Sequence, residues 1–221
     1  MGMWSRATAR ALGAVLLAVL ACCANHGAAR SRDGGAAEAH FRQARELAGT
    51  DPASALDLLE RALAEWPQDD SGGELEVRRW LVHSCALAGD PERGLRHALA
   101  AIEEAPQDAW LRYAKGAALG ELGRHGEAFV AFTEALDRDP EHVKSLQHRG
   151  SVEALLGRHA AAIADFERAL AILETRDPTQ VPEGKSGMLR SIHFHRADSL
   201  DALGRHAEAE AERERAGSMP A

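Results

Sequence analysis

Residues 109–142 read AWLRYAKGAALGELGRHGEAFVAFTEALDRDPEH, and residues of the same kind recur before and after this stretch at a fixed interval of 34 positions. The residues that share this register are Gly89, Gly123 and Gly157; Pro106 and Pro140; Gly116 and Gly150; Ala98, Phe132 and Phe166; and Ala101, Ala135 and Ala169. A fixed interval of this size indicates a repeat protein in which each repeat is one supersecondary unit.

The composition favours helices. Apolar residues make up 45% of the 221-residue chain, whereas aromatic residues make up only 5%. The core must therefore be built mainly from alanine and leucine, which are strong helix formers.

The unit at 109–142 resembles the tetratricopeptide repeat (TPR) family. The matching residues are Gly116, Gly123, Ala128, Phe132, Ala135 and Pro140. The family's common tryptophan at the fourth position is missing, and only Leu81 keeps the leucine of the seventh position. The resemblance implies an all-α fold, an α-α superhelix (TPR solenoid) of about four to five helical hairpins. Stacking buries the apolar side of each hairpin against the next one.

The register also predicts the boundaries of the repeats. The expected units are 36–67, 75–108, 109–142, 143–176 and 190–217, within a solenoid that spans 36–217. Gly204 follows Gly157 by 47 residues instead of 34, so 13 residues are inserted before the last unit. We expect the insert to form a loop at about 177–189, because it contains two prolines and a glycine.

The first residues have the pattern of a targeting segment. Residues 1–21 combine a basic start with an apolar run, which is typical of a signal peptide. The run ends in Val19-Leu20-Ala21-Cys22, which resembles the lipobox of bacterial lipoproteins and implies that Cys22 is lipidated. Residues 22–35 are small, polar and glycine-containing, and they predict a flexible tether. No aspartate follows Cys22, which by family analogy favours the outer membrane, facing the periplasm. The alternative is a secretory peptide cleaved at Ala24, which leaves a soluble secreted or periplasmic module without lipid.

The charge restricts the partners. Removal of residues 1–21 leaves 24 basic and 34 acidic side chains, a formal charge of −10. Such a protein would not neutralise phosphates, so we expect no nucleic-acid partner. Anionic headgroups would repel it too, so we expect contact with the membrane through a lipid anchor only.

A Leu-Gly-Arg-His motif occurs three times, at 122–125, 156–159 and 203–206. In the TPR pattern, a glycine with free backbone angles occupies the turn between the two helices. The expected turn glycines are Gly89, Gly123, Gly157 and Gly204. The histidines of the motif, His125, His159 and His206, then begin the second helices. Helices of neighbouring units lie about 10 Å apart, which is too far to share a metal held at about 2 Å. We therefore predict a structural role and no metal site.

At the seventh position of their units, two basic residues have an acidic residue sixteen positions later: Arg149 is followed by Asp165, and Arg196 by Glu212. In a hairpin, this spacing places each carboxylate on the facing helix. We predict ion pairs within the hairpins, with Arg149 and Asp165 fixing the helix geometry.

The sequence contains no HExxH, CxxC, GxSxG or Walker motif. We therefore expect no enzyme, no catalytic residues and no cofactor. The remaining catalytic alternative is an enzyme or metal protein that uses the histidines.

The resemblance implies a concave surface formed by the first helix of each unit. The predicted partner-binding groove consists of Arg79, His83, Trp110, Tyr113, Lys144, Gln147 and Phe194. Aromatic rings among hydrogen-bond donors suit a peptide groove. Four basic positions coincide with the carboxylate clamp of chaperone-binding TPR proteins, but Ala114 stands where that clamp needs asparagine. We predict a non-catalytic adaptor or scaffold that binds a protein or peptide partner at the cell envelope.

Overall fold

The computed structural model describes residues 35–67, 69–175 and 185–218, and every regular element within these ranges is an α-helix. The helices are α2 (Gly35–Leu47), α3 (Pro52–Glu65), α4 (Ser71–Ala88), α5 (Pro91–Glu104), α6 (Ala109–Glu121), α7 (His125–Arg138), α8 (Val143–Leu155), α9 (His159–Thr175), α10 (Lys185–Ala202) and α11 (His206–Gly217). The predicted signal peptide, Cys22 and residues 22–34 of the tether lie outside the described residues. Within those ranges, no helix combines the length and apolar character needed to cross a bilayer.

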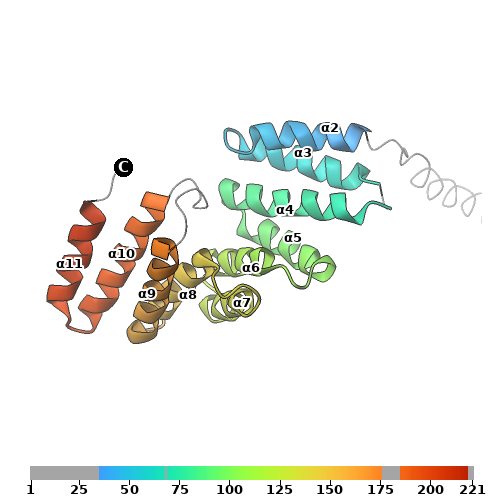
Figure 1. The fold of residues 1–221 in the computed structure, drawn as a ribbon. Helices are drawn as coiled ribbons and strands as arrows, with labels where there is room; N and C mark the ends of the chain where they lie inside the picture. The colour runs from blue at the N-terminus through green and yellow to red at the C-terminus, as the bar shows by residue number, and fades with distance from the viewer. Residues whose placement is uncertain (1–34, 68, 176–184, 219–221) are drawn as a thin grey trace, which may run out of the picture.

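The helices form antiparallel hairpins that stack in chain order. Each hairpin pairs an even-numbered helix with the next odd-numbered one, and each second helix packs on the first helix of the following hairpin. Figure 1 shows this order as a continuous passage from blue to red, and the helix axes turn progressively from α4 to α10 and α11. The prediction of an all-α TPR solenoid is therefore confirmed.

The first helices lie on the inner side of the stack. Helix α4 contacts α6, α6 contacts α8, and α8 contacts α10, whereas no contact of similar extent joins the second helices of the described array. The first helices of neighbouring hairpins are therefore closer to one another than the second helices are. They form the concave surface, on which a ligand can touch several hairpins at once.

The turns inside four hairpins have the same geometry. Gly89, Gly123, Gly157 and Gly204 have φ between 69° and 74°, in the left-handed region. In the third hairpin, the Gly123 amide donates to the Gly120 carbonyl at 3.0 Å, and the Arg124 amide donates to the Leu119 carbonyl at 2.9 Å. These bonds form a Schellman motif, which satisfies the last carbonyls of the first helix.

A glycine on the first helix makes room for an aromatic ring on the second helix. A Cβ atom at Gly116 would lie 2.6 Å from Phe132, and one at Gly150 would lie 2.8 Å from Phe166. In the second hairpin the register places Val82 and Ala98 at the equivalent positions, and both are buried. The large and small residues have exchanged helices there, so the space between the helices is filled in either arrangement.

The second hairpin begins earlier than expected. Helix α4 starts at Ser71, four residues before the predicted start at Leu75. Asp70 caps this helix by accepting a hydrogen bond from the Gly73 amide at 3.0 Å. The Trp66 indole packs against Gly73, where a Cβ atom would overlap the ring, and donates to Asp70 at 3.2 Å. Gly72 and Gly73 therefore lie inside α4, and Gly73 gives the Trp66 ring space against this helix.

The insertion before the last hairpin is partly helical. Helix α9 extends to Thr175, and α10 begins at Lys185, within the predicted loop at 177–189. Met188 and Leu189 pack against the apolar cluster of α8, α9 and α10. Burial of these two apolar side chains favours helix after the last proline of the insertion.

Candidate functional site: the concave groove

The concave surface contains two recesses that share residues. The first has a volume of 580 Å³ and lies between α4 and α6, where it is lined by Arg79, Trp80, His83, Asp108 and Trp110. The second has a volume of 240 Å³, shares His83 and Trp110, and reaches Tyr113 and Lys144. We call the two together the concave groove. It brings together five of the seven predicted groove residues: Arg79, His83, Trp110, Tyr113 and Lys144.

Trp80 forms a wall of the groove that was not predicted. Its ring lies 6.5 Å from the Phe41 ring and 5.8 Å from the His83 ring, in edge-on contacts. The Arg45 guanidinium lies 5.1 Å from the Trp80 ring centre, within the range of a cation–π interaction. Three neighbouring side chains therefore hold this half-buried indole, which is next to Arg79 in sequence.

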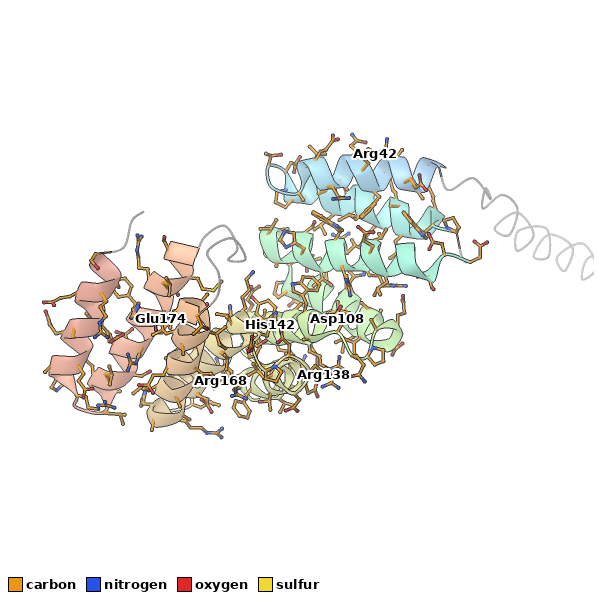
Figure 2. All side chains as sticks on the ribbon, viewed as in Figure 1. Arg42, Asp108, Arg138, His142, Arg168 and Glu174 are labelled. Atoms are coloured by element: carbon orange, nitrogen blue, oxygen red, sulfur yellow. The ribbon has the colours of Figure 1, made fainter. Side chains whose placement is uncertain are left out.

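Asp108 connects two hairpins and orients Trp110. Its carboxylate forms an ion pair with Arg79 of α4 and accepts hydrogen bonds from the backbone amides of Trp110 and Leu111, at 2.8 and 3.2 Å. Figure 2 shows Asp108 between α4 and α6. The same residue that begins α6 thus fixes a wall of the groove against α4.

Tyr113 belongs more to the packing between hairpins than to the groove. Its ring centre lies 6.0 Å from Phe132, 5.2 Å from His142 and 5.4 Å from His148. Burial raises the pKa of the phenol to about 12. Tyr113 also lines the second recess, so its replacement would disturb the fold as well as the surface.

Lys144 gives one end of the groove a positive charge and favours the neutral form of the histidines near it. Lys144 is exposed on α8. Burial and then the charge of Lys144 lower the pKa of His83. Burial lowers the pKa of His148 to about 4, with further effects from Lys144, His195 and His142.

Gln147 and Phe194 do not line the two recesses. The Gln147 side chain donates to the Ser191 hydroxyl at 3.0 Å and so connects α8 to α10. Phe194 lies on α10 with 43% of its surface exposed. The groove therefore occupies the first helices of the second to fourth hairpins.

The charged pairs of sixteen-residue spacing lie inside the hairpins. Arg149 donates two hydrogen bonds of 2.7 Å to Asp165. Arg196 lies 2.9 Å from Glu212, and His193 Nδ1 lies 2.6 Å from the same buried carboxylate. Burial opposes ionisation of Glu212, but His193 and Arg196 together hold its pKa below the usual value. These groups connect the facing helices of their hairpins.

The histidines of the repeated motif have unequal environments. His125 and His159 begin α7 and α9 and are half-buried, whereas His206 begins α11 and is exposed. His206 Nδ1 lies 2.8 Å from Asp201. In the part of the chain that the structure describes, no three histidine, cysteine or acidic side chains lie close enough to hold a metal ion.

A stack of antiparallel hairpins, with turn glycines and a concave face lined by the first helices, defines the class of helical-repeat solenoids. A family model described as tetratricopeptide repeat matches residues 111–142 and 143–172. Residues 111–172 therefore contain two tetratricopeptide repeats.

Solved structures share this fold. The crystal structure described as MamA protein has a TM-score of 0.63 and 16% identity, and the match covers 83% of this chain and 91% of that chain. The structure of TTC0263, a thermophilic TPR protein from Thermus thermophilus, has a TM-score of 0.61 and 25% identity, with 82% and 90% covered. A search of curated protein sequences found no match.

Proposed function

We propose that the protein is a non-catalytic adaptor that holds a protein or peptide partner in the concave groove at the cell envelope, tethered through a lipid on Cys22. The observation that carries the binding role is the recess between Trp80 and Trp110, bounded by the ion pair of Arg79 and Asp108. Tryptophan and arginine are the residues that most often dominate binding at protein interfaces.

The recess suits a short peptide with a large apolar side chain. Two indoles offer apolar area in a site that the ion pair and the Asp108 cap already hold in place, so binding orders few side chains. The surrounding charged and polar side chains provide both donors and acceptors for the peptide backbone.

The tether and the location are supported by sequence. The anchor is supported by the basic start and the apolar run that ends in Leu20-Ala21-Cys22. The absence of an aspartate after Cys22 favours the outer membrane, with the protein facing the periplasm. The second candidate is a soluble secreted or periplasmic module that lacks the lipid.

Site-specific photocrosslinking tests the groove. A photoreactive amino acid would be placed at Trp110 and, as a control, at Leu99 on the second helix α5, where 46% of the residue is exposed. We expect a discrete crosslinked protein from position 110 only, which mass spectrometry would identify in envelope extracts. Equal crosslinking from position 99 would place the interface elsewhere.

The mass of the mature N-terminus tests the anchor. A diacylglycerol adduct on Cys22 would support the lipoprotein, and a free N-terminus at Asn25 would favour the soluble module. This measurement does not depend on the groove, so either half of the proposal can fail alone.

A further inference from the structure

We call the interface between two neighbouring hairpins a joint. The last two joints, between the third and fourth and between the fourth and fifth hairpins, repeat one aromatic contact. His148 on α8 lies 5.7 Å from the Phe132 ring on α7, and His195 on α10 stacks on Phe166 of α9 at 6.1 Å. Each histidine therefore meets the phenylalanine of the hairpin before it. At the preceding joint, the register places Ala114 and Ala98 at these positions, and both belong to one apolar cluster. The histidine contact is thus a feature of the C-terminal joints.

The charged groups that act on His148 within the described residues are cationic or become cationic in acid. They are Lys144 on its own helix, His195 on α10 and His142 just before α8. From α6, the Tyr113 hydroxyl lies 3.4 Å from His148 Nε2, and Phe132 faces it from α7. The carboxylate of Asp165 on α9 is held by two hydrogen bonds from Arg149. A proton on His148 would therefore meet positive neighbours.

At the next joint His195 is exposed, unlike half-buried His148. Its Nδ1 lies 2.7 Å from the Ser191 carbonyl, one turn earlier on α10, and Ser191 accepts the bond from Gln147 of α8. The ring faces Phe166 of α9, while the nearby Glu167 of α9 binds Arg196 at 2.6 Å. A protonated His195 would also repel a protonated His148.

We propose that the joint between the third and fourth hairpins forms an acid-sensitive hinge: when His148 takes up a proton, these two hairpins loosen against one another while each keeps its fold. A cation on an aromatic face is attractive, but only by a modest amount. Burial and the charge of Lys144 both oppose protonation of His148 while the joint is closed. Opening the joint would return the ring to water and let it accept the proton at the ordinary pH for histidine.

The hinge would affect the concave groove, because Lys144 lines the second recess and Tyr113 contacts His148. Loosening of the joint between the third and fourth hairpins would widen that end of the recess. The hinge itself does not depend on the proposed adaptor function.

Distance measurements between spin labels test the hinge in the full chain. With Cys22 and Cys23 replaced by serine, labels at Gly126→Cys on α7 and Ala207→Cys on α11 would report across both histidine joints. Labels at Arg61→Cys and Arg96→Cys would report across the joint between the first two hairpins. We expect the first distance to broaden or lengthen by a few ångströms between pH 7.5 and 4.5, and the second to stay constant. The midpoint should fall between about 4, for buried His148, and about 6.5, for free histidine.

The variant His148→Gln keeps a polar side chain that cannot be protonated in this range. We expect it to lose the response to pH, whereas the exposed control His206→Gln should keep it. An unchanged response in the His148→Gln variant, or a constant distance in the unmodified protein, would overturn the proposal. Circular dichroism would verify that helices persist at pH 4.5, and their loss would overturn it too.

Discussion

Phe132 fills the space that a side chain at Gly116 would need, and the two residues therefore act as one packing unit. In the second hairpin the equivalent residues are Val82 and Ala98, so the same space can be filled from the other helix. The relationship can be tested by giving the third hairpin the small and large residues of the second, through Gly116→Val and Phe132→Ala.

We expect Gly116→Val alone to lower the free energy of unfolding by roughly 1–3 kcal/mol through overpacking. Phe132→Ala alone should cost about 3–5 kcal/mol because it leaves a cavity. The double variant recreates the arrangement of Val82 and Ala98, so its loss should be about 1–3 kcal/mol smaller than the sum of the single losses. Urea denaturation followed by circular dichroism provides the three values. Simple additivity would contradict the packing unit.

The turn geometry predicts opposite effects for two neighbouring glycines. Gly123 has a φ of 72°, so Gly123→Ala should destabilise the protein by about 1–2 kcal/mol. Gly120 lies inside α6, and no atom lies near its absent Cβ. Gly120→Ala should therefore stabilise the protein by about 0.5–1 kcal/mol. Melting temperatures of the two variants would show the difference in sign, and a loss of stability in both would contradict it.

The ion pair of Arg149 and Asp165 should matter far more than an exposed pair of similar geometry. Asp165→Ala leaves a half-buried guanidinium without its carboxylate, and we expect a loss of about 3–5 kcal/mol. Arg124 and Glu127 form an exposed pair at 2.7 Å, and Glu127→Ala should leave the unfolding curve unchanged. Chemical denaturation of both variants tests this, and equal losses would refute the ranking.

The stability of the chain should depend on pH through His148. Its pKa is about 4 in the folded protein, and histidine in an unfolded chain has a pKa near 6.5. Between these values the unfolded chain binds more protons, so stability falls as the pH is lowered through this window. The unmodified protein should lose up to about 3 kcal/mol more than His148→Gln between pH 6.5 and 4. Parallel slopes for the two proteins would contradict the assignment.

The repeat and its register could be predicted from sequence because each hairpin needs the same few small and large residues. The glycines, Phe132 and Phe166 identify the hairpins, and the sixteen-residue interval places Asp165 opposite Arg149. These features depend on local geometry that repeats with the chain.

The details of the groove could not be predicted in the same way. Trp80 adjoins Arg79 in sequence, but whether its ring faces the groove depends on Phe41 and Arg45 from another hairpin. Tyr113 was expected on the surface, and its burial depends on His142, which caps α8, and on His148 within α8. Contacts between hairpins decide these positions, and no interval within one repeat encodes them.

The connection between α9 and α10 shows where this architecture tolerates additional residues. Thirteen extra residues were accommodated there by longer helices and a connecting segment, and α10 still packs on α9. The turns inside the last four hairpins each contain a left-handed glycine, which fixes their geometry. A foreign peptide or a whole domain inserted between two hairpins should therefore leave the stack intact, whereas the same insertion at a turn inside a hairpin should break it.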